Sequence, residues 1–404
     1  MKFLFTAPRF HTNQVPIVKG LLESGHEVRY FVAFVGAMED HTYCEPLVLK
    51  PSKSTIKEKK QLIKTKTESE IESIIGGHFI PDFAFLKKAF EDYMPDAVIC
   101  REKTNLTLCV KNLCDKHSIP CILYDQEPIY RAVTPRSAAN TAKKNSLPDR
   151  VKIKLERRLN PEKKMLMTMR STSGFPKVHI TPVKYSCLLK DAYANTSDEK
   201  NYFVPFVAEP NTGMKRSYYR GGIVNILSVG KYREYKRMDI LIDAVSELSS
   251  DISWRLTIVG QVFSRDEKEY FEKIKKSVKE KHLDNKVKLL SEVPYEKIGE
   301  IYSANDLFVL TSERDYANIS VLEAMSYGMS VITTSFNGTA SYIDEANCGA
   351  VFETENVSDL TKKLDSICRE DIEALGQRAQ EWIRNNCSFD SYENKMMSIL
   401  ENEF

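Results

Sequence analysis

Short apolar runs recur along the chain between longer segments whose apolar residues follow helical spacing, and this alternation restricts the possible folds most. Each run is long enough for a strand buried on both faces and too short for a helix. Strands that alternate with helices predict a parallel sheet. In the second half, the predicted strands are 225–229, 255–259, 287–290, 307–310, 331–334 and 350–352, and the predicted helices include 238–248, 267–281, 295–303 and 357–368.

The first half shows the same alternation, with predicted strands at 3–7, 26–34, 96–100, 119–124, 178–181 and 202–207. A chain of 404 residues is too long for one ordinary hydrophobic core. We therefore predict an α/β fold of two Rossmann-like, doubly wound parallel-sheet domains that face each other across a cleft. The predicted parts are a first domain at 1–208, a polar linker at 209–222, a second domain at 223–385, and a terminal helix at 386–404 that could pack back on the first domain.

Composition excludes several classes of protein. The hydrophobic content of 42% and charged content of 28% are typical of a soluble globular protein, and the net charge of +2 indicates no strongly charged partner. The apolar stretch at the N-terminus is too short for a signal peptide, and no run approaches the length of a membrane span. Nine cysteines without a Cys-x-x-Cys pair favour reduced thiols. We expect a cytoplasmic enzyme.

Residues 143–170 interrupt the alternation with a strongly basic segment that contains interleaved leucines and methionines. A basic amphipathic surface of this kind could rest on the anionic inner face of a membrane. A basic excursion with some packed apolar residues explains the pattern equally well. Nucleic acid is not an expected partner, because no recognition motif accompanies the charge.

Residues 307–334 have the pattern strand, loop, helix, strand. Asn318 is a good helix N-cap, and Gly328 supplies a left-handed stop at the helix end. The loop lies at the carboxyl end of a parallel strand, where a helix start offers an anion site. Two carboxylates, Asp315 and Glu323, bracket this start. Since carboxylates repel phosphate, they are better suited to sugar hydroxyls, and the combination indicates a nucleotide-sugar.

Two further groups of residues follow strands of the same predicted domain. Gly230 permits a tight turn after the 225–229 strand, and Lys231 and Lys236 then project from the loop, where they could neutralise a diphosphate. Gly338 and Thr339 follow the 331–334 strand and permit close approach of a ligand. Each group alone is also consistent with an ordinary loop. Their convergence on carboxyl strand ends favours a binding site.

The segment 226–352 resembles the nucleotide-binding domain of retaining glycosyltransferases of family 4, which have the two-domain GT-B fold. The resemblance covers roughly the second half of the chain by motif and the first half by general layout. The matching motifs are Val229-Gly230-Lys231, Lys236, Asp239-Ile240-Leu241-Ile242, Asp315 with Glu323-Ala324-Met325, Gly328, and Asn337-Gly338-Thr339.

This resemblance implies retaining transfer of a sugar from a nucleoside diphosphate sugar to a hydroxyl acceptor in glycan or lipid-linked synthesis, without cofactor or metal. Lys231 and Lys236 would bind the donor diphosphate and stabilise its leaving charge. Asp315 would hold the sugar hydroxyls, and Glu323 the ribose. The remaining implied donor ligands are the helix-start residues Asn318, Ile319 and Ser320, with Gly230, Gly338 and Thr339.

Several positions depart from the family pattern. Asp315 stands where the family has a glutamate, and Lys231 where it has an arginine, which removes a bidentate fork. Gln126 lies in the place of a histidine near the reacting sugar. The loop after the 3–7 strand lacks the usual glycines. The candidates for the sugar or acceptor side are His11, Asn13, Asp125 and Gln126.

Three other functions share this layout. A nucleotide-sugar epimerase or phosphorylase could use the same scaffold, and so could a non-catalytic protein that binds nucleotide-sugar or lipid. A nicotinamide oxidoreductase is disfavoured, because no Gly-x-Gly-x-x-Gly follows the first strand.

Overall fold

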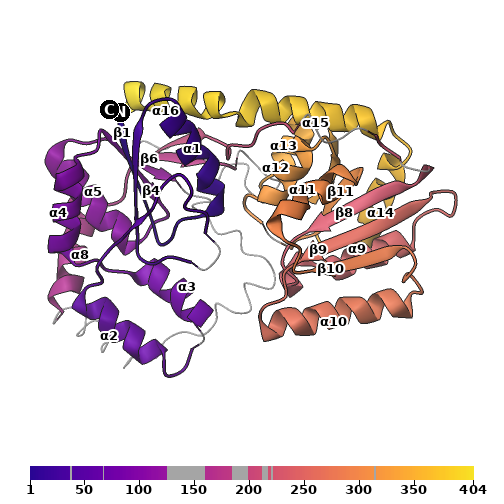
Figure 1. Cartoon of the computed structure of the whole chain (residues 1–404), viewed down its shortest axis with the longest axis horizontal. Coiled ribbons are helices and arrows are strands. Elements are labelled where there is room, and N and C mark those ends of the chain that lie inside the picture. The colour runs from indigo at the N-terminus through magenta and orange to yellow at the C-terminus, as the bar shows by residue number, and fades with distance from the viewer. Residues whose placement is uncertain are drawn as a thin grey trace. The chain divides into compact units, whose positions relative to one another are not determined.

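The computed structural model of the chain describes residues 1–36, 39–66, 68–124, 160–183, 199–211, 217–219, 222–313 and 315–404. The chain forms two compact units, each with its own parallel sheet (Figure 1). Unit 1 comprises Met1–Thr181, Ala194–Val204 and Glu393–Phe404, and unit 2 comprises Pro182–Tyr193 and Pro205–Tyr392. The predicted pair of doubly wound parallel-sheet domains is thus confirmed.

Unit 1 is built on a 7-stranded sheet in the order β3-β2-β1-β4-β5-β6-β7. Its strands are β1 Lys2–Ala7, β2 Glu27–Val32, β3 Leu47–Val48, β4 Ala97–Arg101, β5 Cys121–Tyr124, β6 Val178–Thr181 and β7 Lys200–Phe203. Its helical segments are η1 Thr12–Gln14, α1 Val15–Glu23, α2 Lys53–Leu62, α3 Glu68–His78, α4 Phe83–Tyr93, α5 Asn105–His117 and α8 Pro161–Thr172, and α16 Phe389–Glu403 ends in this unit. Every residue of β4 and β5 is buried, as expected of central parallel strands.

Unit 2 contains a 6-stranded sheet in the order β10-β9-β8-β11-β12-β13. Its strands are β8 Val224–Val229, β9 Trp254–Gly260, β10 Val287–Ser291, β11 Leu307–Leu310, β12 Ser330–Thr334 and β13 Gly349–Phe352. Its helical segments are η3 Glu234–Lys236, α9 Met238–Ser246, α10 Arg265–Glu280, α11 Tyr295–Ser303, α12 Ile319–Ser326, α13 Ala340–Ala346, α14 Val357–Ile367 and α15 Ile372–Cys387. The strands β11 and β12 are buried throughout and form the centre of the core.

The strand order reverses once in each sheet. In unit 1, the chain winds outward in one direction from β1 and in the other from β4, and β1 pairs with β4. In unit 2, the same reversal lies between β8 and β11. Ligands of open α/β sheets bind outside the carboxyl ends of the strands at such switch points. Each unit therefore has one topologically favoured ligand position.

Two local expectations differ from the structure. The predicted strand at 202–207 lies earlier, at β7, and the chain after Phe203 is buried but leaves the sheet. Pro205 lies in this stretch and has no N–H for a strand ladder. Helix α13 was not expected, because its seven residues follow a loop rich in small polar side chains.

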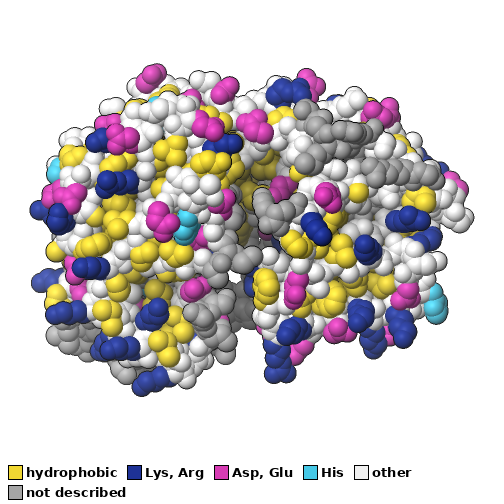
Figure 2. All heavy atoms as spheres, in the orientation of Figure 1, with side chains coloured by type: hydrophobic (Ala, Val, Ile, Leu, Met, Phe, Trp, Pro, Cys, Tyr) yellow, Lys and Arg dark blue, Asp and Glu magenta, His cyan; other side chains and the backbone are white. Residues whose placement is uncertain are grey.

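On the face shown in Figure 2, basic side chains lie among acidic and apolar ones across both units. Residues 143–159, most of the basic segment singled out in the sequence, lie outside the described residues, and α8 forms the rest of it. Among the helices that the structure describes, none has the length and apolar content needed to cross a membrane.

The contact between α15 and the end of α12 yields a stability prediction. A Cβ added to Gly376 would lie 1.9 Å from the carbonyl oxygen of Gly328, whereas one added to Gly77 in α3 would meet nothing within 4 Å. We expect Gly376→Ala to destabilise the chain by about 1–3 kcal/mol or more, because backbone must shift. Gly77→Ala should be neutral or stabilising by less than about 1 kcal/mol. Thermal unfolding of both variants checks this, and equal melting temperatures would contradict it.

Candidate functional site

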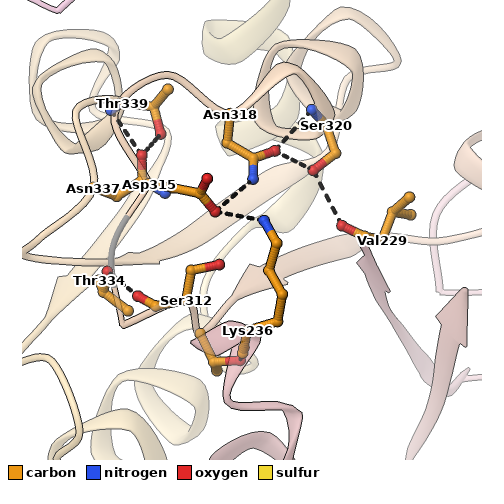
Figure 3. A network of polar contacts seen from close by, with 10 residues as sticks. Val229, Lys236, Ser312, Asp315, Asn318, Ser320, Thr334, Asn337 and Thr339 are labelled. Atoms are coloured by element: carbon orange, nitrogen blue, oxygen red, sulfur yellow. Dashed lines mark hydrogen bonds and ion pairs between the residues drawn. The ribbon is translucent and has the colours of Figure 1, made fainter. Parts of the chain in front are cut away.

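The loops that follow β8 and β11 meet at the switch point of unit 2 (Figure 3). Lys236, at the end of η3, directs its Nζ to Oδ2 of Asp315 at 2.6 Å. Two hydrogen bonds to backbone carbonyls hold the same loops together. The Thr311 hydroxyl donates to the carbonyl of Lys236 at 2.9 Å, and the N–H of Glu313 donates to the carbonyl of Tyr235 at 2.8 Å. The ion pair is thus a link across the position where a ligand is expected.

The surroundings of this ion pair are polar but mostly closed to solvent. The side chains of Lys236 and Asp315 are only 10% and 22% exposed. Oδ2 of Asp315 also accepts from Nδ2 of Asn318 at 3.0 Å. Buried ion pairs are maintained when further hydrogen bonds satisfy their groups, as here. An ammonium has three donors, so Lys236 can bond Asp315 and an anionic ligand together.

The start of α12 points into the same region. Oδ1 of the N-cap residue Asn318 accepts from the N–H of Ser320 at 2.9 Å. The Ser320 hydroxyl also donates to the carbonyl of Val229 at 3.2 Å, which ties α12 to the end of β8. Ile319 is the first residue of the helix. The positive end of the helix dipole therefore adds to the charge of Lys236.

Gly338 and Thr339 hold the Asp315 loop in place. The N–H of Gly338 donates to the carbonyl of Asp315 at 3.0 Å, and a Cβ on Gly338 would lie 1.8 Å from the carbonyl oxygen of Tyr316. Thr339 is fully buried, and its N–H and hydroxyl donate to Oδ1 of Asn337 at 3.0 and 2.8 Å. In the structure Gly338 bonds directly to the loop that carries Asp315, whereas Thr339 braces Asn337 within the loop after β12.

Two buried polar atoms near the ion pair, Oγ of Ser312 and Nδ2 of Asn337, have no hydrogen-bond partner among the described residues. Both side chains are fully buried. Buried polar groups are normally bonded to protein or to ordered water, and an exception calls for an explanation such as a bound water, an ion or a functional role. Sequence reasoning did not single out either residue as a ligand.

Glu323, within α12, is half-buried and accepts a hydrogen bond from the hydroxyl of Tyr302 at 2.7 Å. Burial raises the pKa of Glu323, and the Tyr302 hydrogen bond opposes this shift. The Tyr302 ring stacks on Tyr327 with centroids 5.3 Å apart. One carboxylate oxygen is thereby held in a fixed direction, which suits recognition of a hydroxyl pair.

The loop that bears Lys231 and Lys236 is anchored from outside by Arg233. Its Nε donates to Oε1 of Glu267 at 2.8 Å, and Glu267 completes the capping box of α10 with Ser264. Gly230 precedes this loop, and its N–H donates to the carbonyl of Val259. Lys231, the next residue, is exposed. The Ser-x-x-Glu spacing of Ser264 and Glu267 predicts a capping box from the sequence, but no local pattern indicates that Arg233 bonds to Glu267.

In unit 1, His11 and Asn13 lie in the loop after β1, beside Arg101 at the end of β4. Oδ1 of Asn13 accepts from Nη1 of Arg101 at 3.0 Å. Burial, followed by the nearby charges of Arg101 and Arg9, lowers the pKa of His11 to about 2. Arg101 was not predicted, although a cation directly after an apolar strand is a recognisable signal. The predicted candidates Asp125 and Gln126 lie outside the described residues.

Comparison with known proteins gives a family match in the second half of the chain and several curated relatives. Residues 222–387 match the family described as glycosyl transferases group 1. The chain is 24% identical over 216 residues to N-acetyl-alpha-D-glucosaminyl L-malate synthase of Bacillus anthracis (52% of this chain and 54% of that protein). It is 30% identical over 148 residues to lipopolysaccharide glucosyltransferase WaaG of Escherichia coli (34% and 36%). The matches thus span about half or less of these curated relatives.

Solved structures share the fold over nearly the whole chain. A glycosyltransferase from Rickettsia africae has a TM-score of 0.68 at 14% identity, covering 100% of this chain and 99% of that one. Anabaena Alr3699/HepE in complex with UDP-glucose has a TM-score of 0.64 at 15% identity, covering 99% of each chain. At such low identity these matches establish the fold alone.

The anchor of the lysine loop predicts a pH dependence. Burial by itself would raise the pKa of Glu267, but hydrogen bonds from Ser264, Arg233 and Phe263 outweigh it and lower the pKa from 4.5 to about 2. Because the folded pKa is depressed, the stabilisation is complete above about pH 4.5 and is lost as pH falls toward about 2. Glu267→Gln should therefore destabilise the chain at neutral pH, on the order of 2 kcal/mol.

Chemical denaturation at a series of pH values measures this effect. The difference between wild type and Glu267→Gln should shrink from about pH 4.5 downward. An exposed control, Glu280→Gln at the end of α10, should show no comparable difference. A pH-independent gap between wild type and Glu267→Gln would contradict the assigned ionisation.

Proposed function

From the match of residues 222–387 to the group 1 glycosyltransferase family, we propose that the protein is a retaining glycosyltransferase. It transfers a sugar from a nucleoside diphosphate sugar to a hydroxyl acceptor, with retention at the anomeric carbon. The observation that carries the proposal is the Lys236–Asp315 ion pair, at the switch point and beside the start of α12. It places a cation, a helix N-terminus and a carboxylate around one ligand position.

The proposed chemistry depends on charge that develops on the donor. As the glycosidic bond to the diphosphate breaks, negative charge grows on the diphosphate, and the sugar becomes oxocarbenium-like. Lys236, Lys231 and the start of α12 stabilise the leaving charge, and they are most effective because the protein holds them in place before the reaction. The anchoring of Lys236 by Asp315 and of its loop by Arg233 supplies this preorganisation.

The two carboxylates take different parts of the donor in this proposal. Asp315 faces the donor sugar, and its shorter side chain reaches the hydroxyls while Oδ2 stays bonded to Lys236 and Asn318. Glu323, with one oxygen held by Tyr302, binds the ribose hydroxyls. The UDP and UDP-glucose complexes of Alr3699/HepE support a donor of this class.

The proposed acceptor is a glycan or a lipid-linked glycan, a choice supported by the name of the lipopolysaccharide glucosyltransferase relative. The malate named in another relative widens this class to small hydroxy acids. Peripheral contact of residues 143–170 with an anionic membrane remains a prediction. Epimerase or phosphorylase activity would appear as conversion of the donor without an acceptor, and a binding protein would hold donor without turnover.

Replacement of Lys236 tests the proposal. Lys236→Met keeps the apolar stem and removes the charge, so turnover should fall about 10²–10³-fold, as when a preorganised donor group is lost. Lys276→Met, on the exposed face of α10, is the matched control and should behave as wild type. Release of nucleoside diphosphate is measured for a panel of donors with glycan, lipid-linked and hydroxy-acid acceptors. Turnover of Lys236→Met within about twofold of wild type would sink the assignment.

Loss of the positive charge leaves Asp315 without its counter-ion, so folding must be followed separately. The double variant Lys236→Met/Asp315→Asn removes both charges and is expected to melt close to wild type while remaining inactive. An active double variant would show that the ion pair is only structural.

Isothermal titration distinguishes the roles of the two carboxylates. Glu323→Gln should weaken binding of nucleoside diphosphate and nucleoside diphosphate sugar alike, roughly tenfold, because both contain the ribose. Asp315→Asn should weaken the sugar-containing ligand by that amount and nucleoside diphosphate less, because the diphosphate is affected only through the lost anchor of Lys236. If both variants affect the two ligands equally, the separate assignment of ribose and sugar is wrong.

A further inference from the structure

The switch point of unit 1 contains a second built site, and we propose that it binds an oxyanion, a phosphate or carboxylate group carried by the acceptor. The identification of the ligand as acceptor rests on the proposed function, whereas oxyanion binding itself does not. The site lies between the loop after β1 and the end of β4, which are neighbouring strands. It is formed by residues of unit 1 alone.

The two sides of this site are joined in the same way as those of the donor site. Nη1 of Arg101, the last residue of β4, donates to Oδ1 of Asn13 in the loop after β1 at 3.0 Å. In unit 2, Lys236 and Asp315 link the equivalent loops. The partner in unit 1 is a neutral amide and not a carboxylate. The cation of unit 1 is therefore not neutralised by the residue that positions it.

Arg101 is unusual for a buried guanidinium. Only 4% of it is exposed, and its Nε has no hydrogen-bond partner among the described residues. The nearest carboxylate in an ion pair with it, that of Glu102, lies 3.7 Å from Nε and is 47% exposed. The Tyr124 ring faces the guanidinium at 5.8 Å. Buried charges are normally compensated by close, hydrogen-bonded partners, so Arg101 retains capacity for a bidentate oxyanion.

Gln14 supplies an independent observation at the same loop. Its side chain is 3% exposed, and Nε2 has no hydrogen-bond partner in the part of the chain that the structure describes. Gln14 is also the N-cap residue of α1, and its side chain does not cap the helix. The side-chain amide of Gln14 and the start of the nine-residue helix α1, which no side chain caps, thus lie beside Asn13, the residue that holds Arg101. Both favour an anion.

The other charged groups of the region also favour an anionic ligand. His11 is held neutral by burial and by the charges of Arg101 and Arg9, so two arginines act on one loop. A buried carboxylate of the same unit, that of Glu39, accepts from the N–H of Gly36 at 2.8 Å and lies 3.0 Å from Nε2 of His41. It has its own partners and makes no ion pair with Arg101 among the described residues.

Titration calorimetry with inorganic phosphate and with malate tests the site, in the Lys236→Met background so that the donor site contributes little. Arg101→Gln should weaken oxyanion binding at least about tenfold. The exposed Arg29→Gln on β2 is the matched control and should bind as the parent does. The ring resonances of His11 should shift when the oxyanion is added to the parent and remain unchanged in Arg101→Gln.

Asn13→Ala provides a second variant should Arg101→Gln fail to fold. This variant keeps the guanidinium of Arg101 but removes the amide oxygen that positions it. Oxyanion binding should therefore weaken while the protein remains folded. Binding of phosphate alone, of malate alone or of both supports the site and identifies its preferred oxyanion. Binding of neither, or affinity unchanged in both variants, overturns the proposal. Nucleoside diphosphate binding of Arg101→Gln with Lys236 intact is measured in parallel, so failure of the donor assignment is recognised separately.

Discussion

The ion pair between Lys236 and Asp315 is the interaction on which the candidate site depends. It connects loops that leave two adjacent strands in opposite winding directions, and it is nearly closed to solvent. A charge pair in such a place is stable only with additional hydrogen bonds, and Asn318 provides one. The surrounding loops therefore serve to hold two charges at fixed positions, which is what electrostatic stabilisation of a leaving diphosphate requires.

Much of unit 2 can be understood as support for this pair. Arg233 and Glu267 hold the lysine loop from its outer side. Gly338 permits the loop after β12 to approach the loop of Asp315 more closely than any side chain would allow. The cap of α12 aims a helix dipole at the same place. Substitutions at these supporting residues are expected to alter the proposed reaction through the geometry of the ion pair and not through contact with a substrate.

The two units use the same topology with different charge arrangements. Each has a cation beside its switch point that is held by a side chain from the adjacent loop. In unit 2 that holder is a carboxylate, which suits a ligand with both hydroxyls and phosphates. In unit 1 it is the amide of Asn13, which leaves the charge of Arg101 available. In the two proposals, one topology thereby provides two ligand positions with different chemical preferences.

The sequence alone determined the α/β class, most strand positions and the local caps. Strand β11 and helix α11 have the predicted bounds, because a four-residue apolar run and an amphipathic period are local properties. Asn318 was identifiable as a cap for the same reason. The sequence already placed Lys236 and Asp315 in one expected donor site, but only the tertiary structure showed which distant side chains bond directly. Lys236 and Asp315 are 79 positions apart, and Arg101 and Asn13 are 88 apart. Their contacts depend on the order of strands in a sheet, which no local pattern encodes.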